Sequence, residues 1–158
     1  MRFALIPEVS MKIAFACDHA GFEVKNIVFD FFKKKGFEYK DFGTFSSEAC
    51  DYSDFAHPAA LAVAKKEFDF GVFICGTGVG MCITANKIKG IRASLCHDTF
   101  TAKATREHND SNVLCMGQRV IGIGLMLEIL EAYFSSKFSN AERHINRIRK
   151  ISGIENNL

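Results

Sequence analysis

The chain has 158 residues, of which 48% are hydrophobic and 24% charged, and its formal net charge is +2. This length and composition predict one globular domain with a sizeable buried core. So small a charge gives no reason to expect a nucleic-acid partner or a membrane surface, and no apolar stretch is long enough to span a bilayer.

Strand-like and helix-like segments alternate along the chain from residue 11 onward. Residues 1–10 do not continue into this pattern, so we expect an N-terminal extension at 1–10 and a single domain over 11–158. Short apolar runs predict strands at 12–17, 37–42, 72–75, 91–96 and 113–116. Apolar side chains at helical spacing predict helices at 22–35, 55–66, 81–89, 98–108, 121–134 and 140–151. The tail from Glu155 to Leu158 is expected to fray.

This alternation of strands and helices predicts an open, mostly parallel α/β sheet with helices on both faces. Ligands of such sheets bind outside the carboxyl ends of the strands. That edge is expected to hold Asp18-His19, the loop Gly76–Gly80 and the Cys96-His97 turn. The segment His108-Asn109-Asp110 follows a helix and precedes a strand, so it lies at the opposite edge, where it would more easily serve a neighbouring subunit.

The segment Gly76-Thr77-Gly78-Val79-Gly80 joins a buried strand to a helix. Glycines at alternate positions allow positive φ and let a ligand approach the backbone closely. Backbone amides at the start of the following helix favour an anion. The spacing is neither a dinucleotide fingerprint nor a Walker loop. A tight turn with glycines chosen for packing is the alternative, but an anion or oxyanion site is the better interpretation.

Three side chains near this loop have both a functional and a structural interpretation. Cys75 could be one more buried strand cysteine, but its place before the glycine loop favours a thiolate, acting as nucleophile or as base. Asp18 could simply cap the first helix, or act with His19 beside it. Cys82, one turn into the helix, is expected to serve packing.

Basic side chains recur at helical spacing near the end of the chain, at Arg143, Arg147 and Lys150. The ordinary interpretation is a solvated helix face, but two guanidinium groups one turn apart also form a phosphate clamp. Ser139 stands where an acidic partner of Arg143 would be, which favours the clamp, and Arg119 could join it. From spacing alone His108-Asn109-Asp110 is a helix terminus.

The remaining histidines and the cysteines give structural signals. His57 and His97 are expected to be structural or on the surface. The six cysteines contain no C-x-x-C pair and no regular framework. We expect reduced, mostly buried thiols and a cytoplasmic protein. Residues 3–6 are too short for the apolar region of a secretory signal.

With these motifs in place, the chain resembles the type B ribose-5-phosphate isomerases, the family that also contains the galactose-6-phosphate isomerase subunits. The resemblance rests on five blocks that follow one another in the expected order: KIAFACDHAGF (12–22), KDFGTFSSEACDYSDFA (40–56), ICGTGVGMCITANKIKGIRA (74–93), REHNDSNVLCMGQRV (106–120) and ERHINR (142–147). It implies a three-layer αβα Rossmann-like fold with a five-stranded parallel sheet. It also implies a homodimer, or a tetramer of two dimers, with active sites shared between subunits.

The implied reaction interconverts an aldose phosphate and a ketose phosphate, here ribose 5-phosphate and ribulose 5-phosphate of the pentose phosphate pathway, without metal or organic cofactor. Asp18 and the partner's His108 would open the sugar ring, and Cys75 would move a proton between C2 and C1. The Thr77 hydroxyl and the loop amides would stabilise the cis-enediolate. The other implied contacts are to the substrate, from His19, Tyr52, Gly76, Gly78, Gly80, Asn109, Arg119 and the partner's Arg143 and Arg147.

Two alternatives for the function stay open. A six-carbon sugar phosphate, such as allose or galactose 6-phosphate, needs only a slightly deeper pocket. Galactose-6-phosphate isomerases pair unlike subunits of which one keeps the cysteine, whereas this chain has the full residue set. A second branch of the family carries a glutamate base where Met81 stands here, which leaves Cys75 as the base. From another class, a flavodoxin-like binding module would be yellow with bound flavin.

Overall fold

The computed structural model describes residues 10–157, so the expected extension at 1–10 lies almost entirely outside the described part of the chain. The strands are β1 (Lys12–Cys17), β2 (Glu38–Asp41), β3 (Phe70–Cys75), β4 (Ala93–Leu95) and β5 (Val113–Gly117). The helices are the 3-10 turn η1 (Phe22–Val24), α1 (Lys25–Lys35), α2 (Tyr52–Ala64), α3 (Val79–Ala85), α4 (Thr99–Asn109), α5 (Ile123–Ser135) and α6 (Glu142–Asn156).

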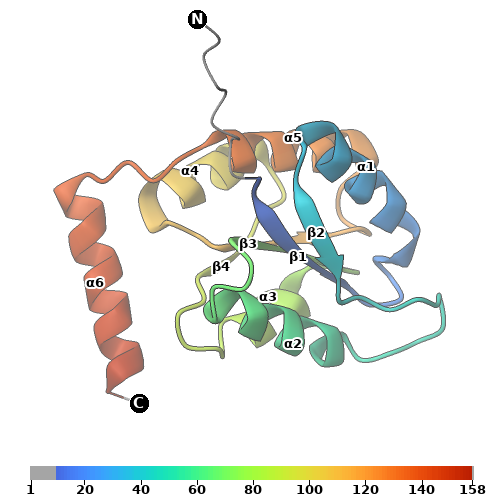
Figure 1. Cartoon of the computed structure of the whole chain (residues 1–158), viewed down its shortest axis with the longest axis horizontal. Coiled ribbons are helices and arrows are strands. Elements are labelled where there is room, and N and C mark those ends of the chain that lie inside the picture. Colours follow the sequence, from blue (N-terminus) through green and yellow to red (C-terminus); the bar gives the residue numbers. More distant parts are fainter. Residues whose placement is uncertain (1–9, 158) are drawn as a thin grey trace, which may run out of the picture.

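The strands form one five-stranded sheet in the order β2-β1-β3-β5-β4, and every neighbouring pair is parallel (Figure 1). Each parallel connection needs a crossover, and the helices between the strands supply it. The chain moves from β1 to one side and from β3 to the other, so the order reverses between these two strands. This arrangement confirms the predicted α/β fold with a five-stranded parallel sheet.

Both faces of the sheet are covered by helices. In Figure 1, α1, α4 and α5 lie over one face and α2 and α3 over the other. Ile13 and Phe15 pack in the cluster under the first group, whereas Ala14 and Ala16 pack in the cluster under the second. Alternating side chains of one strand therefore enter two cores, which is why a central parallel strand is apolar throughout.

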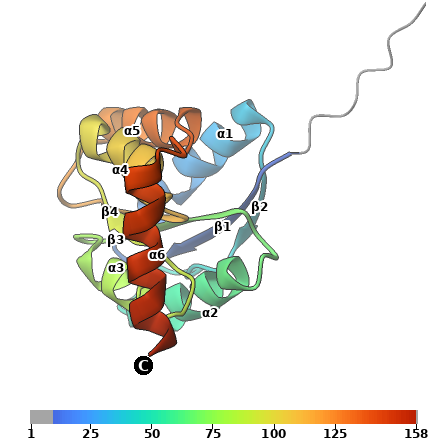
Figure 2. The same ribbon diagram turned by 90° about the vertical axis from the view of Figure 1, so that its left-hand side faces the viewer.

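The last helix, α6, joins neither layer. It runs alongside the body next to α4 and passes from one helical layer toward the other (Figures 1 and 2). The Ser139 amide before it donates to the Glu107 carbonyl of α4 at 3.0 Å. Near its end, the Gly90 amide donates to the Glu155 carboxylate at 3.2 Å. The helix is thus fastened at both ends and leaves much of its surface exposed.

Several predicted boundaries differ from the structure. The predicted fraying is wrong for Glu155 and Asn156, because α6 continues to Asn156 and Glu155 binds the backbone of residue 90, while Leu158 lies outside the described residues. Helix α2 begins at Tyr52 rather than 55, with Pro58 inside it. Helix α3 ends at Ala85 rather than 89. None of the helices within residues 10–157 combines the length and the apolar character that crossing a bilayer requires.

Candidate active site

The carboxyl ends of β1, β3 and β5 meet where the strand order reverses. Cys17 pairs with Ile74, and Cys75 pairs with Gly117. Asp18, Cys75 and Gly117 therefore lie in one row across three strands. In doubly wound sheets this crevice is the place where ligands bind. The predicted edge is confirmed as the meeting place of the Asp18 turn and the glycine loop.

The glycine loop closes on the Cys75 thiol. The Gly78 amide donates to Cys75 Sγ at 3.1 Å, and the sulfur is buried. Gly78 has φ 77°, which only glycine adopts readily, and a Cβ there would stand 2.6 Å from Leu95 Cδ1. The Thr77 hydroxyl accepts from the Val79 amide at 3.3 Å. Both the backbone conformation and the space around it thus require glycine at 78, and the loop's own hydrogen bonds set its shape.

Asp18 and His19 are both fixed by backbone amides. Asp18 is buried, and its Oδ1 accepts from the amides of Ala20 at 2.9 Å and Gly21 at 3.2 Å. Asp18 does not cap the helix, because the N-cap of η1 is Gly21 and has no side-chain bond; Asp18 Oδ1 instead binds the turn before the helix, and Oδ2 takes neither of these bonds. His19 Nδ1 accepts from the Cys50 amide at 3.2 Å. In the neutral ring this puts the proton on Nε2, which makes Nε2 a donor.

Two further predicted residues lie against the same loop. The Tyr52 ring covers Gly80 so closely that a Cβ at 80 would stand 2.5 Å from Tyr52 Cζ. The Arg119 amide donates to the Gly76 carbonyl at 3.0 Å. The Arg119 side chain also lies there, with Nη1 3.5 Å from the point where a Cβ on Gly76 would be. A phenol and a guanidinium thus stand at opposite ends of the glycine loop.

All six cysteines are free thiols, as predicted. Burial raises the pKa of Cys17 and Cys96 to about 12, and it raises the pKa of Cys115 well above its usual range. Cys82 is half-buried, and a hydrogen bond from the Cys115 thiol is the main cause that lowers its pKa to about 7. Cys82 packs against the core under α2 and α3, as expected, but it is also acidic.

A second group of predicted residues gathers on α4 and α6. The ring centroids of His108 and His144 are 4.5 Å apart, and Arg143 Nε donates to His144 Nε2 at 3.2 Å. His108, Arg143 and Arg147 are exposed, whereas His144 is buried. Within residues 10–157 neither of these two arginines forms an ion pair, so the group presents uncompensated positive charge that suits an anion.

Ion pairs and hydrogen bonds hold the turn after α4 in place. Asp110 has φ 45°, and its carboxylate bridges Arg92 at 3.0 Å and Arg106 at 2.9 Å. Arg92 Nε also donates to the Asn109 carbonyl at 3.0 Å. Asp110 is thus part of the scaffold, which leaves the exposed side chains of His108 and Asn109 free to meet a ligand.

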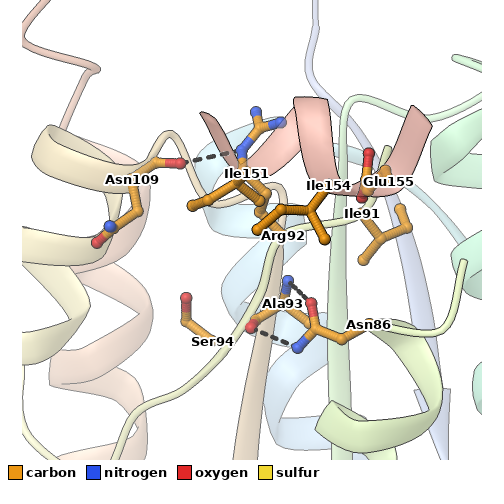
Figure 3. A pocket seen from close by; sticks show the side chains of 9 residues that line it. All are labelled: Asn86, Ile91, Arg92, Ala93, Ser94, Asn109, Ile151, Ile154 and Glu155. Carbon is orange, nitrogen blue, oxygen red and sulfur yellow. Dashed lines mark hydrogen bonds between the residues drawn. The ribbon is translucent and has the colours of Figure 1, made fainter. Parts of the chain in front are cut away.

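The structure does not bring the two groups of residues together in one chain. Asp18, His19, Tyr52, the glycine loop and Arg119 lie at the carboxyl edge of the sheet. His108 and Asn109 precede β5 and so lie at the other edge, as predicted, about 16 Å away along a five-residue strand. Asn109 lines a cavity of about 420 Å³ between α6 and the start of β4 (Figure 3). Cys75 does not line it.

The sequence missed some residues that support the site. The Cys50 amide binds His19, and no local sequence pattern predicts a contact between residues 31 positions apart. Gly117 has no room for a side chain, because a Cβ there would stand 2.6 Å from the Thr77 carbonyl. His97 is structural, as expected, since its Nε2 accepts the Gly117 amide at 3.1 Å. In residues 10–157 no three His, Cys, Asp or Glu side chains converge in a way that could hold a metal ion.

A doubly wound parallel sheet with a thiol, a carboxylate and a glycine loop at its switch point defines a small-molecule enzyme of the α/β class. The ribose/galactose isomerase family model matches residues 13–151. The chain belongs to this family.

Individual relatives agree with the family assignment. The chain is similar to ribose-5-phosphate isomerase B of Escherichia coli strain K12, with 46% identity over 144 residues, which are 91% of this chain and 96% of the relative. It is 37% identical to the galactose-6-phosphate isomerase subunit LacB of Clostridium acetobutylicum, covering 93% of this chain and 85% of that one. The solved structure of Clostridium thermocellum ribose-5-phosphate isomerase B superimposes with a TM-score of 0.90 at 45% identity, covering 93% of this chain and 99% of that chain.

Proposed function

We propose that this isomerase interconverts ribose 5-phosphate and ribulose 5-phosphate, with Cys75 as the base. The observation that carries the proposal is the Cys75 sulfur, which accepts the Gly78 amide beside Asp18 at the switch point of the sheet. The names of the Escherichia coli and Clostridium thermocellum relatives support the five-carbon substrate. We assign the reaction to the pentose phosphate pathway and, because all six thiols are free, to the reducing cytoplasm.

The chemistry conserves atoms and electrons without a cofactor. The Cys75 thiolate takes the proton from C2 of the open-chain aldose, and the C–H electron pair forms a double bond between C1 and C2. The carbonyl oxygen O1 becomes the enediolate oxyanion, which loop amides and the Thr77 hydroxyl would stabilise. The thiol returns its proton to C1, the O2 proton moves to O1, and O2 becomes the ketone.

Four side chains of this chain would act on the substrate around that step. Asp18 Oδ2, which does not bind the turn amides, would exchange a proton with the ring oxygen or the anomeric hydroxyl. His19 Nε2 would donate to the phosphate, because Nδ1 is held by Cys50. Tyr52 and Arg119 stand on either side of the glycine loop, and there they would limit the pose of the sugar.

The other half of the site would come from a second copy of the chain. In a two-fold dimer every contact between the two subunits occurs twice. If the residues on α4 and α6 lay over the partner's glycine loop, the dimer would therefore have two identical sites. These residues are His108, Asn109, Arg143 and Arg147. Apolar side chains are exposed on both halves, among them Val79 and Ile83 on α3 and Ile151 and Ile154 on α6. Ile151 and Ile154 also wall the cavity of Figure 3, where the Asn86 side-chain amide is already paired with the Ala93 backbone, so apolar side chains of the partner would fit beside them.

A substrate panel tests the proposed reaction. Purified protein given ribose 5-phosphate or ribulose 5-phosphate should reach the same equilibrium mixture from both sides, before and after dialysis against a chelator. Allose 6-phosphate and galactose 6-phosphate are the comparison, because the family includes a galactose-6-phosphate isomerase subunit. A higher kcat/KM on a six-carbon sugar would replace the five-carbon assignment. A flavin absorbance spectrum would instead favour a binding module.

A further inference from the structure

His144 differs from its neighbours on α6 in being buried. Its side chain is 3% exposed, while Arg143 and Arg147 on the same helix are exposed. Both of its ring nitrogens have partners within the chain. Ser139 Oγ lies 2.7 Å from Nδ1, and Arg143 Nε lies 3.2 Å from Nε2. The ring also faces His108 with a centroid distance of 4.5 Å and an interplanar angle of 41°.

These contacts determine which nitrogen carries the proton. A guanidinium can only donate, so Nε2 must offer its lone pair to Arg143. The proton of the neutral ring is then on Nδ1, and it is donated to Ser139 Oγ. Ser139 is itself fixed, because its amide donates to the Glu107 carbonyl and its Oγ accepts the Ala141 amide at 3.2 Å. A chain of hydrogen bonds therefore runs from the α4 backbone to the guanidinium of Arg143.

The surroundings of His144 favour the neutral ring, which is the form that these hydrogen bonds require. Burial is the largest cause that lowers the pKa of His144 below its usual value, and the neighbouring His108, Arg143 and Arg147 lower it further. The ring is thus neutral at neutral pH, and Nε2 remains an acceptor. A protonated ring would present a second donor to Arg143 and would repel it.

We propose that His144 is a positioning residue that holds the Arg143 guanidinium and the His108 ring in register for the substrate of the partner subunit. This inference rests on the proposed function, in which Arg143 binds the phosphate and His108 opens the ring. His144 does not itself touch the substrate, since both of its nitrogens are engaged. Its loss should act through Arg143, which a double-mutant cycle can measure.

Three variants separate this role from packing. His144→Phe keeps the ring beside His108 and removes both nitrogens, whereas His144→Gln keeps an amide oxygen within reach of Arg143. Ser139→Ala removes the partner of Nδ1, together with the acceptor of the Ala141 amide, and serves if His144→Phe does not fold. We expect His144→Phe to raise the KM for ribose 5-phosphate, and the Ki of inorganic phosphate as inhibitor, by about tenfold. Ser139→Ala should raise both severalfold, and His144→Gln should restore most of the loss.

The double variant Arg143→Ala/His144→Phe decides the question. If His144 acts through Arg143, the KM of the double variant should equal the KM of Arg143→Ala alone. Fully additive increases, or a His144→Phe variant that changes only the melting temperature, would overturn the inference. A different result would strike the proposed function itself: no isomerisation by the wild type, or an unchanged KM in Arg143→Ala. The two failures are therefore distinguishable.

Discussion

The Cys75 sulfur and the Gly78 amide are 3.1 Å apart, and the amide donates to the sulfur. This contact exists because Gly78 turns the backbone at φ 77°, directly before α3. The hydrogen bond holds the sulfur at the end of β3, against the glycine loop. The loop thus fixes the position of the group that, in the proposed reaction, must take a proton from carbon.

Replacing Cys75 by alanine should abolish catalysis and leave binding. General base catalysis contributes on the order of 10² to 10⁴ in rate, so we expect kcat of Cys75→Ala to fall by about 10³ or more. The Ki of inorganic phosphate should change by less than about twofold, since the proposed phosphate contacts come from His19 and the partner's arginines and not from Cys75. Cys82→Ala is the matched control and should keep its kcat. Near-normal turnover of Cys75→Ala would exclude the thiol as the base.

Glycine 78 should tolerate no side chain. In Gly78→Ala the Cβ would stand 2.7 Å from the Met116 carbonyl carbon, and the residue would hold a positive φ. We expect the free energy of unfolding to fall by about 2 kcal/mol. The kcat of the folded protein should fall as well, because the amide moves away from Cys75. Gly124→Ala is the control, since nothing lies within 4 Å of its Cβ and it is inside α5. That change should stabilise the protein by about 0.5 kcal/mol. Equal kcat values for the two variants would contradict the role of the loop.

Mixed dimers should recover activity if the site is shared. Cys75→Ala and His108→Ala should each be inactive, since each removes one half of the proposed site. A dimer of one chain of each kind has one intact site, so an equal mixture should recover about a quarter of the wild-type rate. The measurement is kcat after co-expression and after separate expression with late mixing. A co-expressed mixture as inactive as its parents would mean that His108 does not serve the partner's Cys75.

The sequence predicted which residues meet at the site better than it predicted where the helices begin and end. The alternation of strands and helices is enough to place Asp18 and Cys75 at one edge and His108 at the other, because parallel strands all point the same way. The start of α4 was also predictable, since Asp98 accepts the Thr101 amide at 2.6 Å, which is a local capping signal. The start of α2 was not, because Asp51 makes no such bond and Tyr52 is held by its packing on Gly80.

Contacts between distant residues explain the other gaps. Glu155 binds an amide 65 residues away, so no local pattern could extend α6 to Asn156. His144 is next to Arg143 in the sequence, but its burial depends on α4 and on Ser139. Sequence spacing showed the basic face of α6 and could not show which of its residues is turned inward.

Cys82 should be the fast-reacting thiol among the structural cysteines. Its pKa is about 7, whereas burial raises those of Cys17 and Cys96 to about 12. The thiolate is the form that reacts, and its fraction rises as pH rises through the pKa. Labelling by iodoacetamide in a Cys75→Ala background should therefore increase with a midpoint near pH 7, and Cys82→Ala should abolish this phase. A midpoint above pH 8.5, the ordinary thiol value, would contradict the lowered pKa.

Lys25 should stabilise the loop between β2 and α2, which contains Cys50, the residue whose amide binds His19. Its Nζ lies 2.7 Å from Asp41 Oδ2 and also donates to the Thr44 carbonyl, and its side chain is 7% exposed. Lys25→Met would leave a partly buried carboxylate and a carbonyl without their donor. Removing one partner of a buried pair costs about 3 kcal/mol, so urea should unfold this variant at a clearly lower concentration.

Lys33→Met is the control for the Lys25 variant, because its pair with Asp30 at 3.3 Å is exposed and should contribute less than about 0.5 kcal/mol. The same Lys25 change should raise the KM for ribose 5-phosphate, since the loop from Thr44 leads to Cys50, which holds His19. A matching midpoint in urea for Lys25→Met and Lys33→Met would show that the buried pair does not fasten this loop.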